Sequence, residues 1–296
     1  MVMSAKQTGD PVQLKSGVWK ISDQDGQRVM KVLRSQGEWQ LNRMRQSGQL
    51  ERAAFEAGIP MAIPVIPVLD GVGLWTPLGD ERYVRLTEFV DGPHPDIDLK
   101  LARWVGSTLA QIEQLRLPAA VDESYPVHPL EEWAKWLGEA RLMSLLPAVS
   151  DATRIIQSGL ATEPVFQLAH RDVSTVNIIA SPRGLVLIDF DHAGPEVPWW
   201  EFVHHVFNLD PSEAFVRPAF ESYIQSGGTT GATDETAFAG YFRGMLEWIA
   251  YNVWLTLGHR DVPQSRRDEA HSIVHTGQIS LPQELRSLDE WITLLR

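Results

Sequence analysis

The sequence predicts an α+β protein with a small β-rich N-terminal part and a larger, mainly helical C-terminal part. Short β-favouring runs separated by glycine-containing turns dominate residues 1–90, whereas helical periodicity dominates from residue 99 onwards. The segment DGPHP at residues 91–95 breaks both patterns, because proline and glycine interrupt regular structure. We therefore expect two domains, 1–90 and 91–296.

The N-terminal part has the pattern of a sheet around one helix. Its first two strands are joined by Asp25-Gly26, a dipeptide typical of hairpin turns. A helix is expected over 38–57, because Gly58 follows it directly and glycine commonly ends helices. The expected strands cover residues 18–21, 28–33, 64–68, 72–76 and 82–90.

The C-terminal part is helical except for two apolar, strand-like runs at 165–168 and 185–188. Its expected helices cover residues 99–115, 130–146, 152–160, 200–208, 212–225, 234–257, 264–275 and 282–295. We find no internal repeat and no low-complexity segment in the sequence.

Composition limits the class of protein. A chain of 296 residues with 44% hydrophobic and 22% charged residues is long enough for a large core and typical of globular proteins. No apolar run approaches the length of a membrane span, and the N-terminus lacks the apolar stretch of a signal peptide. Because there are no cysteines, disulfides and thiolate metal sites are excluded. We expect a cytoplasmic protein that does not act on a membrane.

The net charge of −12 is unevenly distributed along the chain. Residues 1–90 carry 11 Lys or Arg and 10 Asp or Glu, whereas residues 91–296 carry 15 and 28. A negative field of this kind concentrates cationic ligands and repels nucleic acid. Acidic surfaces also serve solubility alone, so both interpretations remain open.

Each strand-like run of the C-terminal part is followed by an acidic residue. The sequence HRDVSTVN at 170–177 follows the first run, and Asp189-Phe190-Asp191 ends the second. Asp172, Asn177 and Asp189 together make up the set that phosphoryl transfer from ATP requires. The alternative is two buried strands whose C-terminal ends carry polar residues without a catalytic role.

From His170 to Glu201 the sequence resembles the aminoglycoside phosphotransferase-like small-molecule kinases, the APH and choline kinase type, and the resemblance extends over about residues 11–260. It implies a bilobal protein-kinase-like fold, with ATP or GTP bound between the lobes. It also implies transfer of the γ-phosphoryl group to a hydroxyl of a small molecule.

The resemblance implies a role for each motif residue of the C-terminal lobe. Asp172 would be the catalytic base, and Asn177 and Asp189 would bind Mg²⁺ through hard oxygen atoms. His170 would be a buried structural residue. Asp191 occupies a position where the family often has an acid, with either a metal-assisting or a surface role.

In the N-terminal lobe, Lys31 is the candidate for the phosphate-contacting lysine, since it lies inside an apolar strand where a charge needs a partner. Ser16 and Gly17 would belong to the turn over the phosphates. Glu88 and Val90 belong to a segment that resembles the inter-lobe hinge, whose backbone would bind adenine.

The sequence departs from the family at three points. The glutamate that would pair with the lysine is not evident, with Glu51 the nearest acid and Glu38 further upstream. Arg171 stands where most small-molecule members have glycine, and residues 174–176 replace a Pro-Gly pair. Because Asp191 follows the Asp-Phe pair and no activation loop fits before residue 198, we expect no protein substrate.

Recognition of the acceptor would belong to the helical lobe, where carboxylates and aromatic side chains suit an amine. Aromatic residues at helical spacing are more often core, so this set is a group of candidates only. The candidates are Glu196, Glu201, Asp210, Glu247, Trp248, Tyr251, Asn252 and Trp254.

The sequence therefore predicts a small-molecule O-kinase that uses ATP (or GTP) and Mg²⁺, with a cationic antibiotic such as an aminoglycoside or basic peptide as acceptor. A metabolic amino alcohol, sugar or nucleoside fits the same chemistry. A catalytically silent nucleotide-binding protein is a second interpretation, because the turn at Gly17 has a single glycine and the glutamate partner is not evident. An α+β hydrolase that uses its acids with a metal is a third.

Overall fold

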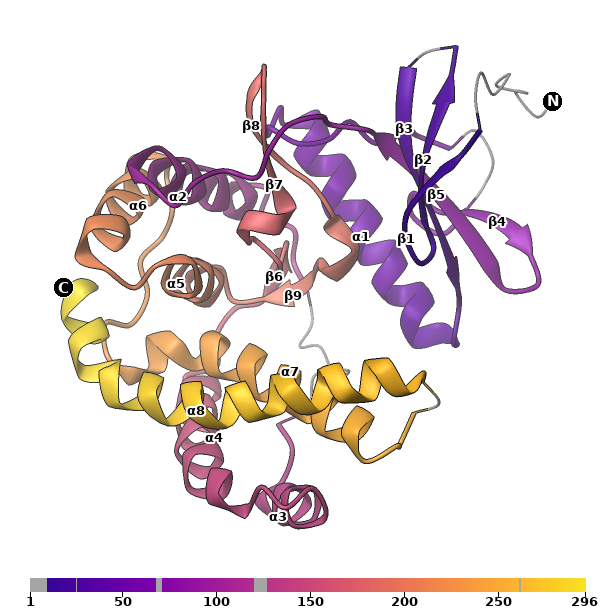
Figure 1. Cartoon of the computed structure of the whole chain (residues 1–296). Helices are drawn as coiled ribbons and strands as arrows, with labels where there is room; N and C mark the ends of the chain where they lie inside the picture. The colour runs from indigo at the N-terminus through magenta and orange to yellow at the C-terminus, as the bar shows by residue number, and fades with distance from the viewer. Residues whose placement is uncertain (1–9, 25, 68–70, 120–126, 261) are drawn as a thin grey trace.

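The N-terminal lobe is built on a five-stranded antiparallel sheet with the strand order β1-β2-β3-β5-β4 (Figure 1). The computed structural model describes residues 10–24, 26–67, 71–119, 127–260 and 262–296. Asp25 of the expected hairpin turn and Val68 of an expected strand lie outside these ranges, whereas Gly26 begins β3 opposite Asp23. The strands are β1 (Val12–Lys15), β2 (Val18–Asp23), β3 (Gly26–Arg34), β4 (Thr76–Gly79) and β5 (Arg82–Glu88).

Helix α1 (Glu38–Glu56) follows β3 and lies between the sheet and the helical lobe (Figure 1). It ends at Ala57, so the expected helix 38–57 is confirmed. Close packing of α1 depends on Gly48, since a Cβ atom there would lie 2.7 Å from the backbone nitrogen of Leu74. The expected strand 72–76 is wrong in extent, because Val72 and Trp75 form only an isolated bridge before β4 begins.

The segment after α1 ties the two lobes together through its backbone. The Leu187 N–H donates to the Pro60 carbonyl, and the Ala62 N–H donates to the Leu187 carbonyl, both at 2.9 Å. Pro64 forms a bridge with Thr87 of β5, so the strand expected at 64–68 is reduced to this single pairing in the described residues. This segment thereby fixes β5 relative to the hairpin that carries the acidic motif.

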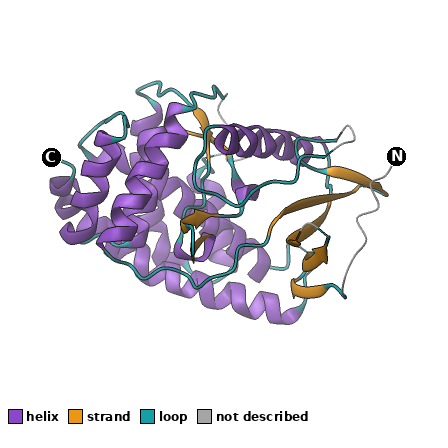
Figure 2. Ribbon diagram, turned by 90° about the horizontal axis from the view of Figure 1, so that it is seen from above, coloured by secondary structure: helices purple, strands orange, loops and turns teal. Residues whose placement is uncertain are grey.

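The C-terminal lobe is a group of packed helices (Figure 2). They are α2 (Leu99–Gln114), α3 (Leu130–Glu139), α4 (Leu146–Leu160), α5 (Pro198–Leu209), α6 (Glu213–Gln225), α7 (Ala239–Thr256) and α8 (Gln264–Leu294). Among the described helices none is long and apolar enough to cross a bilayer.

Several of the expected helices are wrong in their bounds. The helix expected over 152–160 begins earlier, with α4 at Leu146, and the one expected over 234–257 starts as a 3₁₀ turn before α7. The helix expected over 130–146 ends at Glu139, because Arg141 adopts a left-handed φ of 59° and Leu142 turns into the core. The helices expected over 264–275 and 282–295 are one continuous helix, α8, with Pro282 inside it. Proline removes one backbone hydrogen bond, and burial of Leu281, Leu288 and the α7-facing side of α8 outweighs that loss.

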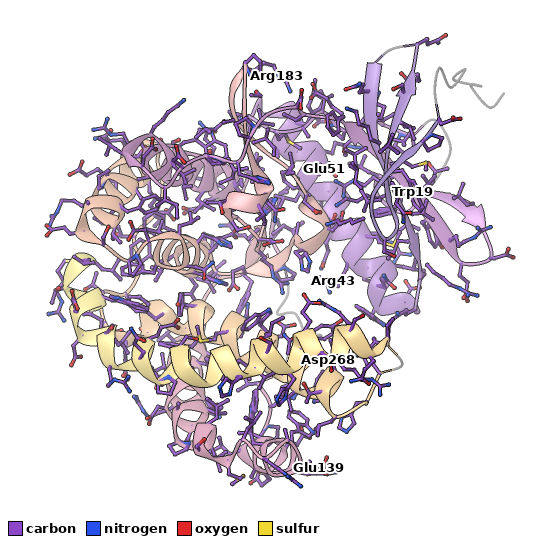
Figure 3. All side chains as sticks on the ribbon, viewed as in Figure 1. Trp19, Arg43, Glu51, Glu139, Arg183 and Asp268 are labelled. Carbon is purple, nitrogen blue, oxygen red and sulfur yellow. The ribbon has the colours of Figure 1, made fainter. Side chains whose placement is uncertain are left out.

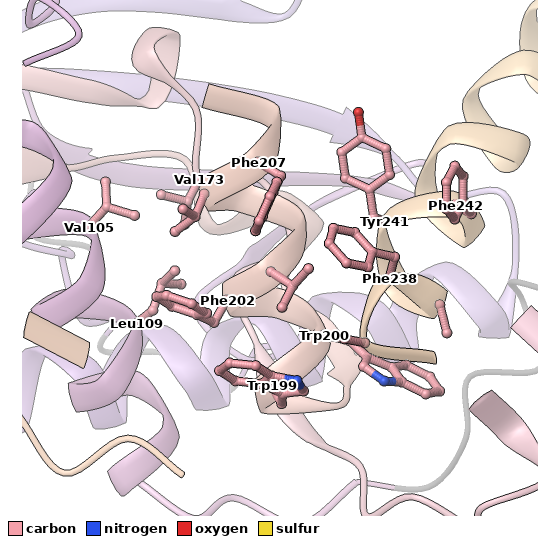
Figure 4. Packing of buried hydrophobic residues seen from close by; sticks show 14 of the residues in the cluster. Val105, Leu109, Val173, Trp199, Trp200, Phe202, Phe207, Phe238, Tyr241 and Phe242 are labelled. Atoms are coloured by element: carbon pink, nitrogen blue, oxygen red, sulfur yellow. The ribbon is translucent and has the colours of Figure 1, made fainter. Parts of the chain in front are cut away.

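The core of the helical lobe is rich in aromatic side chains (Figure 4). The Trp199 and Phe202 rings of α5 stack with centroids 5.3 Å apart, and Phe207 meets Phe238 edge to face at 4.9 Å. Two small antiparallel pairs lie beside this core: β6 (Gln167–Ala169) with β9 (Gly194–Glu196), and β7 (Ile178–Ser181) with β8 (Gly184–Leu187). The strands expected at 165–168 and 185–188 are confirmed as β6 and β8, and their bounds differ from the expected ones by one or two residues.

Candidate active site

The loop that follows β6 is organised around a buried histidine. His170 is fully buried, and its ring lies edge-on against Phe190 with centroids 4.5 Å apart. Its Nδ1 accepts a hydrogen bond from the Asp172 backbone N–H at 3.3 Å. Burial lowers the pKa of His170 to about 4, so the ring is neutral near pH 7. This histidine supports the loop and has no exposed atom with which to act on a substrate.

Asp172 and Asn177 are linked within the same loop. The Asn177 side-chain amide donates to the Asp172 carbonyl at 2.9 Å, and the Ile188 N–H donates to the Asn177 carbonyl at 2.9 Å. The second bond places Asn177 beside the strand that leads into Asp189. Burial raises the pKa of Asp172, which favours a carboxylate able to accept a proton.

Asp189 lies at the end of β8 in a left-handed backbone conformation with φ of 63°. Its carboxylate accepts a hydrogen bond from the Lys31 ammonium, and Lys15 Nζ lies 3.9 Å from its second oxygen. Burial disfavours the charge of Asp189, but the two lysines and Arg85 outweigh it and hold its pKa well below the ordinary value. Asp189 is therefore ionised throughout the neutral range.

Lys31 of β3 is one of the residues through which the two lobes make ionic contacts. Besides Asp189, its ammonium contacts Asp191 at 2.8 Å, and both acids belong to the C-terminal lobe. The structure thus brings together Lys31, Asp189, Asn177 and Asp172, four residues that the sequence predicted to share one site.

Neither candidate glutamate pairs with Lys31. Glu38 forms an exposed ion pair with Arg45 at 2.7 Å. Glu51 lies on α1 (Figure 3). It is fully buried and accepts a hydrogen bond from Arg85 of β5 at 2.9 Å. Arg85 was not among the predicted site residues, although a charge between the apolar residues Val84 and Leu86 is the same kind of signal that identified Lys31.

Ser16 and Gly17 form the turn between β1 and β2 above the lysine. Gly17 has a left-handed φ of 73°, and its carbonyl accepts the Val32 N–H at 2.9 Å, which holds the turn over β3. Together with Lys31 and Asp191 they line a pocket of about 280 Å³. The expected phosphate-side residues Ser16, Gly17 and Lys31 are therefore neighbours.

The expected hinge residues Glu88 and Val90 do not line this pocket. The Glu88 carboxylate accepts hydrogen bonds from Arg183 at 2.8 Å and from the Ile63 N–H at 3.2 Å. Its backbone N–H donates to the Ile63 carbonyl at 2.8 Å. Val90 follows β5 as a half-buried residue in the connection to the helical lobe. The side chain of Glu88 thus has a structural partner, and only backbone atoms of this segment are candidates for contact with a base.

A second, larger pocket of about 610 Å³ opens beside Asp172. Its wall is formed by residues of the helical lobe and by one arginine of α1, Arg43. The lining residues are Arg43, Arg171, Asp172, His192, Glu196, Glu201, His204, His205, Gly240, Arg243, Gly244, Glu247, Trp248, Tyr251 and Arg266. Of the acceptor candidates, Glu196, Glu201, Glu247, Trp248 and Tyr251 are in this wall.

The other acceptor candidates lie elsewhere. Asp210 caps the turn before α6 by accepting the Ser212 N–H at 2.9 Å. Asn252 is buried and donates to the Trp248 carbonyl at 2.7 Å, and the Trp254 ring packs edge to face on Trp136 with centroids 5.1 Å apart. These two residues belong to the core.

Glu201 of α5 stabilises the backbone of the loop that follows β6. It is 3% exposed, and its Oε1 accepts hydrogen bonds from the N–H groups of His170 at 2.9 Å and Arg171 at 3.0 Å. Arg171 has a left-handed φ of 65°, a conformation that glycine adopts more readily. Burial raises the pKa of Glu201 to about 7.

The oxygen atoms of Asp189 and Asn177 suit a magnesium ion. Mg²⁺ is commonly bound by one or two carboxylates together with phosphate oxygens of the substrate. Among the described residues there is no group of three or more His, Cys, Asp or Glu side chains that could hold a metal by themselves. The donor set therefore fits a metal that arrives with a nucleotide.

A sequence comparison with protein families decides the affiliation of the chain. The profile of APH, the phosphotransferase enzyme family, matches residues 13–239. The chain belongs to this family. The APH resemblance read from the motifs is thereby confirmed, and the chain is a small-molecule phosphotransferase. No curated protein sequence matches it significantly.

Solved structures share the bilobal fold of this APH family member at low sequence identity. Amicoumacin kinase hAmiN, in complex with AMP-PNP, Ca²⁺ and Ami, is similar with a TM-score of 0.63 and 14% identity over 94% of this chain and 89% of the other. Spectinomycin phosphotransferase with ADP and spectinomycin gives 0.62 and 13% over 93% of each chain. Plasmodium vivax ethanolamine kinase gives 0.54 and 14% over 90% and 80%.

Proposed function

We propose that this protein transfers the γ-phosphoryl group of ATP (or GTP) to a hydroxyl group of a small molecule. The observation that carries the proposal is the meeting of Lys31 with Asp189 across the two lobes, next to Asn177 and Asp172. A lysine, two oxygen ligands and a base in one place are the parts that position phosphates and activate a hydroxyl.

In this proposal each residue has one task. Lys31 binds a phosphate of the nucleotide, and the backbone of the Ser16-Gly17 turn covers the phosphates. Asn177 and Asp189 would hold Mg²⁺, which neutralises charge on the phosphate oxygens when bound. Asp172 orients the acceptor hydroxyl and accepts its proton, a role that its raised pKa and its place on the larger pocket support.

We assign nucleotide binding to residues 1–90, including the hinge backbone from Glu88 to Val90, and acceptor binding to residues 91–296. Two similar proteins support a nucleotide and an acceptor in one molecule, since one binds ADP with spectinomycin and the other AMP-PNP with Ami. The pocket of about 280 Å³ is lined by Lys31 and the pocket of about 610 Å³ by Asp172, which is consistent with this division.

We infer that the acceptor is cationic, such as an aminoglycoside or a basic peptide antibiotic. Trp248 is 46% exposed and Tyr251 is also exposed, and both lie in the pocket wall with Glu247. Aromatic faces beside a carboxylate favour an ammonium group. Arg43, Arg171, Arg243 and Arg266 also line the pocket, and two of them are ion-paired, Arg243 with Glu196 and Arg266 with Glu269, each at 2.5 Å.

A metabolic amino alcohol is the second candidate acceptor, because an ethanolamine kinase is among the similar structures and its substrate is also an amine. The pocket of about 610 Å³ favours a larger molecule over a small amino alcohol. Both candidates would react by the same chemistry at Asp172, so a panel that contains acceptors of both classes is needed to separate them.

The test is a mass-shift assay with ATP and Mg²⁺ on a panel of aminoglycosides, basic peptide antibiotics and amino alcohols. We expect one class to gain a single phosphoryl group with the wild-type protein and none with Asp172→Asn. If the panel gives no turnover and Asp172→Asn changes no measured property, the protein is a silent nucleotide binder. Thermal stabilisation by Mg²⁺ with AMP-PNP, absent with Mg²⁺ alone, argues against a metal-dependent hydrolase.

A further inference from the structure

A continuous series of ionic contacts runs from α1 to the phosphate-binding lysine. Glu51 of α1 accepts a hydrogen bond from Arg85 Nη2 at 2.9 Å, and Arg85 Nη1 donates to Asp191 Oδ1 at 2.6 Å. The other oxygen of Asp191 accepts from the Lys31 ammonium at 2.8 Å, and Lys31 also contacts Asp189. Arg85 is thus the only residue of this series that contacts both Glu51 and Asp191.

The burial of this series requires that its charges stay paired. Arg85 is 3% exposed and Glu51 is fully buried. A buried charge that loses its partner strongly destabilises the folded state. The planar guanidinium of arginine can bind two carboxylates in fixed directions, which the ammonium of lysine cannot do.

The strand register places two cations face to face. Lys31 of β3 is the direct cross-strand partner of Arg85 of β5. Like charges directly opposite one another on a sheet repel, and Asp191 contacts both of them with one oxygen each. Asp191 therefore holds the lysine and the arginine in a common geometry, and its own orientation is fixed by Arg85.

We propose that Arg85 is a positioning residue for phosphoryl transfer, which holds Asp191 as the carboxylate partner of Lys31 and ties both to α1 through Glu51. This inference rests on the proposed function. Asp189 would take part in two interactions, because it contacts Lys31 in the structure and would bind Mg²⁺ with the nucleotide. If Asp189 bound the metal, Asp191 would remain the carboxylate partner of Lys31, and the Arg85 guanidinium would hold Asp191 in its present orientation.

The test compares Arg85→Met and Arg85→Lys with wild type in calorimetric titrations with Mg²⁺–AMP-PNP and with adenosine. We expect Arg85→Met to raise the Kd for Mg²⁺–AMP-PNP at least tenfold and to leave the Kd for adenosine within twofold. A loss of structure alone would weaken the binding of both ligands. Arg82→Met is the matched control, because Arg82 lies on the same strand with half its side chain exposed, and we expect no change from it.

Arg85→Lys keeps the charge and tests the two-sided contact if Arg85→Met does not fold. We expect it to raise the Kd for Mg²⁺–AMP-PNP at least threefold, because an ammonium cannot hold Glu51 and Asp191 in the same directions. If a folded Arg85 variant binds Mg²⁺–AMP-PNP as wild type does, the positioning role is refuted. If wild type binds adenosine but no Mg²⁺–AMP-PNP, the proposed function itself fails and this inference fails with it.

Discussion

Replacement of the buried Glu201 by glutamine should change how stability depends on pH. In the folded protein the pKa of Glu201 is raised to about 7 by burial, whereas an unfolded chain has the ordinary value of about 4.5. Between these two values the folded state holds more protons than the unfolded state, so stability is lost as pH rises. Integration from pH 5 to pH 8 gives a loss of about 2.5 kcal/mol from this one group.

Glutamine keeps a carbonyl oxygen for the N–H groups of His170 and Arg171 but does not ionise. The difference in unfolding free energy between Glu201→Gln and wild type should therefore move in favour of the variant by about 2.5 kcal/mol from pH 5 to pH 8. Urea denaturation at the two pH values measures it, and the other titrating groups cancel in the difference. Glu221→Gln on the exposed face of α6 should give a difference that does not change with pH. A pH-independent difference for Glu201→Gln would refute the reasoning.

Four further substitutions have expected outcomes. Asp172→Asn should lower turnover by roughly 10²–10⁴-fold, measured with whichever acceptor reacts, and should leave the affinity for Mg²⁺–AMP-PNP unchanged. Lys31→Met should raise the Kd for Mg²⁺–AMP-PNP in a calorimetric titration. It removes the cation that contacts Asp189 in the structure and that we propose binds a phosphate of the nucleotide. Gly48→Ala should lower stability by about 1–3 kcal/mol in urea denaturation, because its Cβ would lie 2.7 Å from backbone. Gly138→Ala, whose Cβ would meet only the Met143 sulfur at 3.8 Å, should instead raise stability by about 0.5–1 kcal/mol.

The residues of the catalytic loop were predictable because each one belongs to a local pattern. Asp172 and Asn177 stand at fixed offsets after an apolar strand, and Asp189 ends the next one. Helix 38–57 was predictable for a similar local reason, since Gly58 follows it. In such cases the sequence determines the local structure, and the hydrogen bond from the Ile188 N–H to the Asn177 carbonyl continues the local pairing of β7 with β8.

The contacts that depend on pairing between distant segments were not predictable in this way. Which carboxylate meets Lys31 depends on the register of β3 with β5 and on where the 3₁₀ turn after Asp189 reaches α1. Arg85 and Asp191 are 106 residues apart, and no local pattern connects them. The continuity of α8 through Pro282 likewise depends on packing against α7, which outweighs the local preference of proline to end a helix.

Two motif residues, Arg171 and Asp189, have left-handed backbones, and side-chain contacts support each of them. Arg171 precedes Asp172 with φ of 65°, and Asp189 has φ of 63°, so the base and a proposed metal ligand both depend on conformations that cost about 1–3 kcal/mol each. Glu201 offsets the first by accepting two N–H groups of the loop, and Lys31 with Lys15 offsets the second by fixing the Asp189 carboxylate. Since the contacts that hold Asp189 come from the N-terminal lobe and those that hold Arg171 come from α5, the two left-handed residues are supported independently by different lobes.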